Sequence, residues 1–179
     1  MTYKATLLDA ASVNRALKRL SFEIVEKNKG TDNICILGIK RRGICIAKTI
    51  RDNIFHNENA AVPVGELDIT FYRDDLSGKN PFPTVNSCDI GFDINGKTVI
   101  IADDVIFTGR TVRAAIEAVF QLGRPQAVQL AVLIDRGHRE LPIKADYVGK
   151  NIPTSLNEIV RVTFPEYDNC ETAVEIWSK

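Results

Sequence analysis

The sequence predicts an α/β fold, because short apolar strands alternate with helical segments along the chain. Residues 34–39, 99–102 and 127–134 are apolar runs of the length expected for buried strands. The first two runs are each followed by apolar residues at helical spacing. Ligands of open α/β sheets bind outside the carboxyl ends of the strands. The polar residues that follow each run are therefore the candidates for function.

Length and composition fit one soluble domain with a sizeable core. The chain has 179 residues, of which 45% are apolar and 26% charged. Lys and Arg together number 23, as do Asp and Glu, so the zero net charge provides no general attraction to nucleic acid. We find no signal peptide, no apolar run near the ~18 residues of a membrane span and no Cys-x-x-Cys pair. We therefore expect a cytoplasmic protein without membrane contact.

The N-terminal part of the chain predicts an amphipathic helix over residues 9–29, with Gly30 at the C′ position after its end. Arg15, Lys18 and Arg19 flank its apolar stripe. A solvated helix face is the simplest interpretation of these cations. A binding role needs support from elsewhere in the chain.

Three consecutive cations, Lys40, Arg41 and Arg42, separate the strand at 34–39 from the next helix. Cations at a helix N-terminus oppose the helix dipole, so a bound anion is expected to offset the cost. A pyrophosphate group has the required charge. The alternative is an ordinary surface turn.

The segment from residue 61 to 98 holds a strand, a loop and a turn. Alternation begins at Leu67, and residues 76–87 have the composition of a long loop, often a mobile lid, that follows Arg73. Residues 91–98 match the pattern G-x-x-x-x-G-K-[ST] of a P-loop. A P-loop follows a strand and starts a helix, whereas Lys97 and Thr98 run into a strand. We therefore expect a hairpin turn at Asn95 and Gly96 and no ATPase site.

Residues 99–111 are the most informative stretch. Asp103 and Asp104 end an apolar strand, and residues 108–111 open a helix that stops near Gly123. Unpaired N–H groups at the helix start and the hydroxyls of Thr108 and Thr111 favour a phosphate. The two carboxylates suit sugar hydroxyls or a metal held near them. The alternative is a plain strand–turn–helix in which the acids cap the helix.

The C-terminal part places a polar cluster, residues 135–140, after the strand at 127–134. A short strand is expected at 145–148, a turn at 150–155, and closing strands at 159–164 and 174–177. His138 could act as a general base or a metal ligand. The only other histidine lies in a polar loop without metal-site spacing, so a surface or RNA contact is favoured.

The thirteen residues 99–111 resemble the phosphoribosyl diphosphate (PRPP) signature of type I phosphoribosyltransferases. Together with residues 38–43, 67–75 and 135–155, they make most of the chain similar to the PyrR family of pyrimidine operon attenuation regulators. The resemblance implies a type I phosphoribosyltransferase fold as a single domain over residues 1–179. That fold has a mostly parallel twisted sheet flanked by helices, a small hood and a flexible loop. It also implies a homodimer or a higher oligomer.

The same resemblance implies two activities. One is a uracil phosphoribosyltransferase that converts uracil and PRPP to UMP and diphosphate with Mg²⁺, which PRPP and water mainly hold without dedicated protein ligands. The other is UMP-dependent binding of a pyrimidine-operon leader RNA hairpin, which promotes transcription termination. The alternatives are a stand-alone salvage enzyme without RNA binding and a purely regulatory RNA binder. Retention of both acids disfavours the second alternative, and retention of residues 135–155 disfavours the first.

Residue roles follow from the resemblance as expectations. Asp103, Asp104 and Arg73 are the catalytic residues, and Arg73 begins the flexible loop. The loop that binds pyrophosphate often carries a non-proline cis peptide in such enzymes. The substrate-binding residues are Lys40, Arg41, Arg42, Asp103, Asp104, Val105, Ile106, Phe107, Thr108, Gly109, Arg110, Thr111, Asp135 and Arg136, of which the last two are expected near the base. The RNA-binding residues are Arg15, Lys18, Arg19, His138, Arg139, Lys144 and Lys150.

Overall fold

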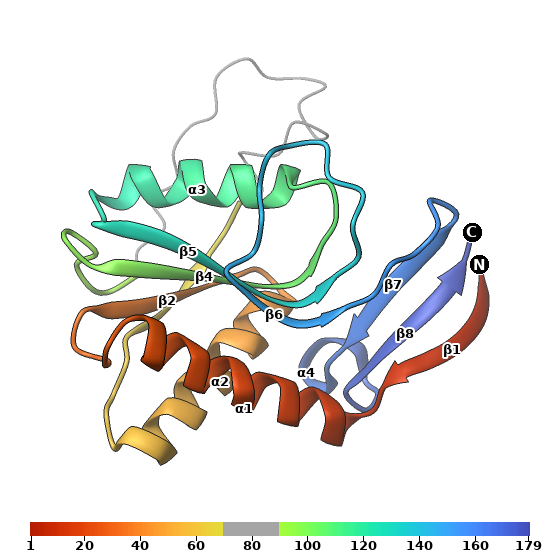
Figure 1. Cartoon of the computed structure of the whole chain (residues 1–179), viewed down its shortest axis with the longest axis horizontal. Helices are drawn as coiled ribbons and strands as arrows, with labels where there is room; N and C mark the ends of the chain where they lie inside the picture. The colour runs from red at the N-terminus through yellow and green to blue at the C-terminus, as the bar shows by residue number, and fades with distance from the viewer. Residues whose placement is uncertain (70–89) are drawn as a thin grey trace.

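The computed structural model describes residues 1–69 and 90–179 and contains two sheets (Figure 1). The larger is a parallel sheet in the order β3-β2-β4-β5-β6. Its strands are β2 (Ile34–Ile39), β3 (Val64–Leu67), β4 (Thr98–Ile106), β5 (Ala127–Asp135) and β6 (Tyr147–Asn151). The α/β prediction and the parallel sheet are thereby confirmed.

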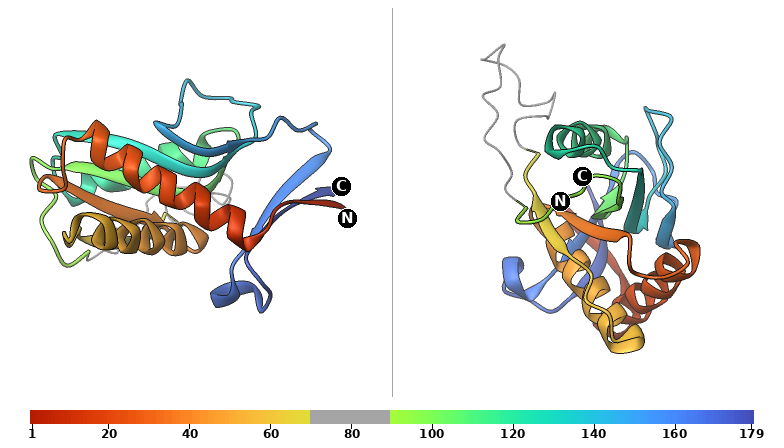
Figure 2. Two further views of the ribbon diagram at one scale, coloured as in Figure 1. Left: turned by 60° about the horizontal axis from the view of Figure 1, so that its bottom comes forward. Right: turned by 90° about the vertical axis from the view of Figure 1, so that its left-hand side faces the viewer.

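Helices cover both faces of this sheet (Figures 1 and 2). Helices α1 (Ala10–Lys27) and α2 (Arg42–Glu58) pack on one face, and α3 (Arg110–Leu122) packs on the other. All six residues of β2 are buried, as expected for a parallel strand covered on both sides. Two apolar clusters result, one under α1 and α2 and one under α3. This arrangement leaves the carboxyl ends of the strands as the edge available for a site.

A smaller antiparallel sheet lies at one end of the molecule and holds both chain termini (Figure 1). It consists of β1 (Thr2–Leu8), β8 (Ala173–Ser178) and β7 (Glu158–Thr163), with the short helix α4 (Pro165–Asp168) between β7 and β8. We refer to residues 1–8 and 158–179 as the hood. The closing strands β7 and β8 were predicted. Strand β1 was not, because it is largely exposed and its partner β8 comes from the far end of the chain.

The end of α1 differs by one residue from the prediction. Asn28 is the C-cap, and Lys29 takes the left-handed C′ position with φ = 56°. The N–H groups of Lys29 and Gly30 donate to the carbonyl oxygens of Glu26 and Val25 at 3.1 and 3.0 Å. These two bonds form a Schellman motif. The placement of Gly30 at C′ was therefore wrong, and Gly30 occupies C″.

The turn before β4 is present, but it does not form a hairpin. The N–H of Lys97 donates to the carbonyl of Ile94 at 3.1 Å, which closes the turn. Strand β4 has parallel partners on both sides, β2 and β5, which leaves no position for an antiparallel neighbour. The prediction of a hairpin was therefore wrong. The exclusion of a P-loop stands, because Lys97 and Thr98 lead into a strand and not into a helix.

Several other strand and turn boundaries differ from those predicted. Strand β3 begins before Leu67, and β6 runs to Asn151, so the turn expected at 150–155 starts inside a strand. The expected flexible loop and Arg73 lie outside the described residues. Over the described ranges, no helix combines the length and apolarity that a membrane span requires.

Candidate active site

The acid pair lies within β4 rather than after its end. The parallel register with β5 continues past the pair, with Asp103 opposite Val132 and Val105 opposite Ile134. The prediction that the acids end the strand was therefore wrong, because pairing with β5 extends the strand to Ile106. The position of the acids near the carboxyl edge of the sheet is retained.

Backbone N–H groups hold both carboxylates. The N–H of Asp104 donates to Oδ1 of Asp103 at 3.0 Å, and the N–H of Val105 donates to Oδ1 of Asp104 at 2.9 Å. Asp103 is 7% exposed. Burial raises the pKa of Asp104, although the backbone N–H of Val105 and the positive charge of Arg42 act in the opposite direction. Asp104 thus combines a desolvated carboxyl with a nearby cation.

The predicted phosphate loop, residues 108–111, leads into the start of α3. Gly109 is the N-cap, and its φ of 94° is a conformation that favours glycine. No side chain among the described residues caps this helix, and only the N–H of Arg110 has a hydroxyl acceptor, Oγ1 of Thr108 at 3.3 Å. The first turn of α3 therefore presents N–H groups to an anion.

The segment that follows β5 is hydrogen-bonded to this loop. The carbonyl of Thr108 accepts bonds from the N–H groups of Glu140 and Leu141 at 2.9 and 3.2 Å. Nε of Arg110 donates to Oε2 of Glu140 at 2.8 Å. The segment after β5 thus fixes the phosphate loop, and neither Glu140 nor Leu141 was predicted to belong to the site. Their backbone contacts carry no sequence signal.

Three consecutive cations, two between β2 and α2 and one at the first residue of α2, lie beside the acid pair. The peptide bond between Lys40 and Arg41 is cis, which confirms that expectation. A Cβ on Gly43 would stand 2.4 Å from the carbonyl oxygen of Ala102, the residue before the acids. Only glycine allows this contact between the two backbones. We call Lys40, Arg41 and Arg42 the pyrophosphate loop, and Gly43 holds it against β4.

The cations of this loop have carboxylate partners. Nζ of Lys40 lies 3.6 Å from Oδ2 of Asp68. Arg42 donates from Nη2 and Nε to the two carboxylate oxygens of Asp168, in α4 of the hood, at 2.7 and 3.2 Å. This pair raises the pKa of Arg42 and lowers the pKa of Asp168. Asp168 was not predicted, since nothing in its local sequence points to a residue of α2.

Arg136 and Arg139 are engaged within the chain. Arg136 is 6% exposed and donates to Oγ1 of Thr154 and the carbonyls of Ser155 and Glu158 at 3.1, 3.2 and 2.8 Å. Arg139 donates to the carboxylate of Asp135. Its other acceptors are the carbonyl oxygens of Phe107, Ile143 and Gly137. Both side chains therefore organise the edge of the sheet, and their binding roles stay predictions.

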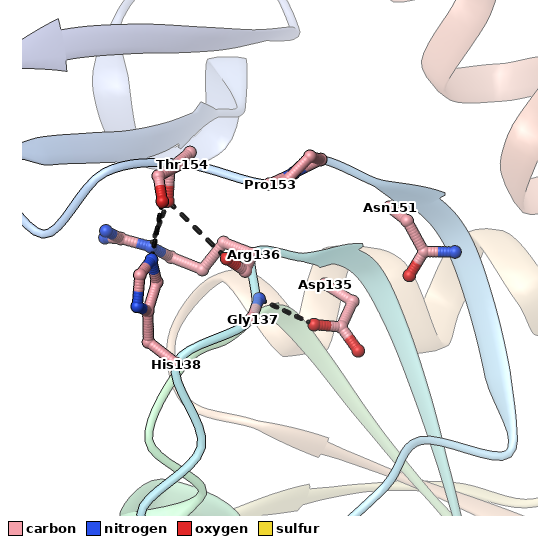
Figure 3. A pocket seen from close by; sticks show the side chains of 7 residues that line it. All are labelled: Asp135, Arg136, Gly137, His138, Asn151, Pro153 and Thr154. Carbon is pink, nitrogen blue, oxygen red and sulfur yellow. Dashed lines mark hydrogen bonds between the residues drawn. The ribbon is translucent and has the colours of Figure 1, made fainter.

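An open pocket of about 480 Å³ lies at the ends of β5 and β6 (Figure 3). His138 and Thr154 line one part of it, with the imidazole Nε2 bonded to the carbonyl of Thr154, and Asp135 and Asn151 line another. Asp135 accepts a bond from the N–H of Gly137 at 2.9 Å. The residues expected near the base thus lie at a cavity next to Phe107, whose ring is 5.9 Å from that of His138.

Of the predicted RNA-binding residues, Arg15, Lys18 and Arg19 lie on α1 and Lys150 lies on β6, whereas His138, Arg139 and Lys144 lie in the segment between β5 and β6. Nη2 of Arg19, on α1, donates to the carbonyls of Val148 and Gly149 on β6 at 3.0 and 2.7 Å. This contact brings the exposed cations of α1, Arg15 and Lys18, to the same side of the core as β6. The cations of α1 and the strand β6 therefore lie on the same side of the core, while RNA contact stays a prediction.

Comparison with known proteins agrees with this geometry. A phosphoribosyl transferase domain model matches residues 5–168. The chain is 62% identical over 163 residues to the bifunctional protein PyrR of Caldicellulosiruptor bescii, covering 91% of this chain and 90% of that protein. It is 56% identical over 181 residues to the bifunctional protein PyrR of Oceanobacillus iheyensis, covering both chains completely.

Solved structures share the fold at low identity. A hypoxanthine-guanine phosphoribosyltransferase from Bacillus anthracis has a TM-score of 0.72 and 19% identity, covering 98% of both chains. A hypoxanthine phosphoribosyltransferase from Trypanosoma cruzi has a TM-score of 0.72 and 18% identity, covering 98% of this chain and 97% of that one. The fold is therefore that of a type I phosphoribosyltransferase. The chain belongs to the phosphoribosyltransferases and, among them, to the PyrR family.

Proposed function

We propose that this protein is a bifunctional regulator that makes UMP from uracil and PRPP and binds pyrimidine-operon leader RNA in a UMP-dependent way. The observation that carries the enzymatic half is the contact of Gly43 with the Ala102 carbonyl. It sets a cationic loop beside the buried Asp103 and the partly buried Asp104, and the start of α3 follows the same strand. These three parts match the diphosphate, ribose and 5′-phosphate of PRPP.

The chemistry of the transfer follows from these groups. Asp103 and Asp104 accept hydrogen bonds from the ribose hydroxyls and stabilise positive charge that develops on the sugar. The N–H groups at the start of α3 and the hydroxyls of Thr108 and Thr111 hold the 5′-phosphate. Lys40, Arg41 and Arg42 bind the departing diphosphate, so electrostatic stabilisation supplies most of the catalysis. Arg73 is proposed to reach the diphosphate when the loop closes.

Mg²⁺ accompanies PRPP in this proposal. PRPP and water would mainly hold this ion, and the carboxylates of Asp103 and Asp104 at the sheet edge suit a metal held near them. The ion neutralises the diphosphate charge and improves it as a leaving group.

The uracil ring is proposed to bind at the ends of β5 and β6. The cavity there is lined by Asp135, Arg136 and Asn151 among others. Because this pocket lies next to Phe107 of the PRPP stretch, a base bound there is near the reacting sugar. The same proposal has the whole chain fold as one domain and act in the cytoplasm as a homodimer or higher oligomer.

The regulatory half rests on the family and on the grouping of cations. Lys18 on α1 and Lys150 on β6 are exposed, and Arg19 joins the two elements. An RNA hairpin would be bound through its phosphates and through bases splayed from the loop. UMP in the active site would favour the RNA-binding form, which is a coupling between two sites.

The test is a gel-shift titration of the leader hairpin with and without UMP, over a series of salt concentrations. We expect tighter binding with UMP and a steep loss of affinity with salt. A parallel assay measures UMP synthesis from uracil and PRPP. Protein that makes UMP but fails to bind the hairpin at low salt would be a salvage enzyme. Protein that makes no UMP would overturn the enzymatic assignment.

A further inference from the structure

We infer that Asp168 of the hood is a positioning residue for the phosphoribosyl transfer. It binds Arg42 and orients the guanidinium of this arginine toward the diphosphate of PRPP. The inference rests on the proposed function of the pyrophosphate loop. It adds a residue from the hood to a site otherwise built by the core sheet. Asp168 acts through Arg42 and does not itself touch the substrate.

The Asp168 carboxylate is held rigidly on its own side. Its side chain is 6% exposed. Oδ2 accepts the N–H of Phe164 at 3.0 Å, and Nη2 of Arg161 lies 3.7 Å from Oδ1. All three residues belong to the hood, so contacts within the hood orient the Asp168 carboxylate independently of Arg42. A carboxylate fixed in this way can orient a flexible arginine.

The contact with Arg42 has the bidentate geometry that specifies direction as well as charge. It uses Nε and Nη2, which leaves the two N–H groups of Nη1 outside the pair. Arg42 is the first residue of α2, directly before Gly43 and its contact with β4. The guanidinium is also close enough to Asp104 to oppose the rise of its pKa. Arg42 therefore lies between the hood carboxylate and the acid pair.

This arrangement predicts an effect specific to PRPP. Without Asp168 the guanidinium keeps its charge but samples other rotamers, so binding diphosphate costs conformational entropy. Uracil and UMP carry no diphosphate and should be affected little. A role confined to holding the hood in place would instead change the use of uracil and PRPP together, because the carbonyl of Glu158 in the hood accepts a bond from Arg136, which lines the base pocket.

The experiment compares Asp168→Asn with a matched control, Asp52→Asn. Asp52 also accepts bonds from Nε and Nη2 of an arginine, Arg51, but on the exposed part of α2. We expect Asp168→Asn to raise the KM for PRPP about tenfold, with the KM for uracil and the affinity for UMP within about twofold. Asp52→Asn should match the parent protein. Asp168→Glu, which restores the carboxylate, should recover part of the PRPP affinity.

Each result has a distinct meaning. An unchanged KM for PRPP in Asp168→Asn, or equal changes in its KM values for PRPP and uracil, would overturn the inference. The proposed function would still stand, provided that the parent protein makes UMP. Absence of UMP synthesis by the parent protein would instead remove the proposed function. If Asp168→Asn does not fold in a thermal melt, Asp168→Glu and Arg42→Lys carry the test. Both keep the charges and alter the bidentate geometry, so each should raise the KM for PRPP selectively.

Discussion

The guanidinium carbon of Arg136 lies 4.1 Å from the centroid of the Phe107 ring. Phe107 belongs to the stretch that resembles the PRPP signature, whereas the hydrogen bonds of Arg136 go to Thr154 and Ser155, just before the hood, and to Glu158 within it. Burial lowers the pKa of Arg136. A single buried arginine therefore connects the end of β4, at the predicted phosphate-binding edge of the core, to the hood.

Replacing Arg136 by Lys should destabilise the protein. A lysine keeps the charge but lacks the planar fork that reaches a hydroxyl and two carbonyls at once. We expect the free energy of unfolding to fall by about 2–3 kcal/mol, measured by urea titration. Arg124→Lys, at an exposed arginine, should leave the midpoint unchanged. Equal stability of the Arg136 variant and the parent would contradict the bridging role.

The double substitution Asp103→Asn with Asp104→Asn should abolish UMP synthesis with the fold intact. Neutral amides keep the shape of the side chains but cannot stabilise positive charge on the sugar. Steady-state turnover and circular dichroism of the same preparation check both statements. Near-normal turnover would show that the acid pair is not catalytic.

Asp104→Asn alone should make stability depend less on pH. Because burial raises the pKa of Asp104 above its ordinary 3.8, ionisation favours the unfolded chain. The stability contributed by the protonated form is present below pH 3.8 and is lost as pH rises through the raised pKa. The Asn variant should therefore match the parent near pH 3 and exceed it at neutral pH. Urea titrations across this range measure the difference, and a neutral-pH loss of stability would reverse the expected sign.

Gly43→Ala should displace the pyrophosphate loop from the acid pair. The new Cβ would meet the Ala102 carbonyl oxygen at 2.4 Å, and neither backbone can yield locally. Overpacking of this kind costs about 1–3 kcal/mol, and the KM for PRPP should rise. Gly65→Ala is the matched control, because its new Cβ would meet side-chain atoms of Leu37 and Ile90, at 2.8 and 3.0 Å, rather than backbone. Equal kinetics of the two variants would contradict a specific role for Gly43.

Removing Lys144 and Lys150 together should weaken RNA binding without slowing UMP synthesis. Both lysines are exposed, Lys144 on the segment between Arg139 and β6 and Lys150 on β6 itself. Loss of two phosphate contacts should reduce the slope of log affinity against log salt by about 1.4–1.8. The control removes Arg124 and Lys179, which carry the same charge elsewhere on the surface. If both double variants lose affinity equally, the predicted RNA face is misplaced.

Features that depend on residues near one another in the chain were predictable. The strand and helix that flank the acid pair follow from apolar periodicity, which reflects burial on both faces of a parallel sheet. The cationic loop and the helix start at Gly109 also belong to short continuous stretches, whereas the cis peptide was expected only from the family resemblance. Their positions in sequence already imply that they meet at the carboxyl ends of neighbouring strands.

Arg139 shows where such reasoning stops. Its sequence context predicts an exposed cation available to RNA, yet in the structure its guanidinium bonds three backbone carbonyls and Asp135. Backbone acceptors leave no trace in residue identity. Whether an arginine faces solvent or braces a loop is therefore decided only by the folded chain.

The sequence by itself determined the α/β class, the acid pair and the phosphate loop, because each depends on the period and chemistry of adjacent residues. Tertiary structure alone decided that β1 pairs with β8, that β4 extends through the acids, and that Asp168 grips Arg42. The physical reason is that these contacts join segments distant in sequence. Their energy comes from pairing and burial that arise only when the core sheet and the hood are assembled.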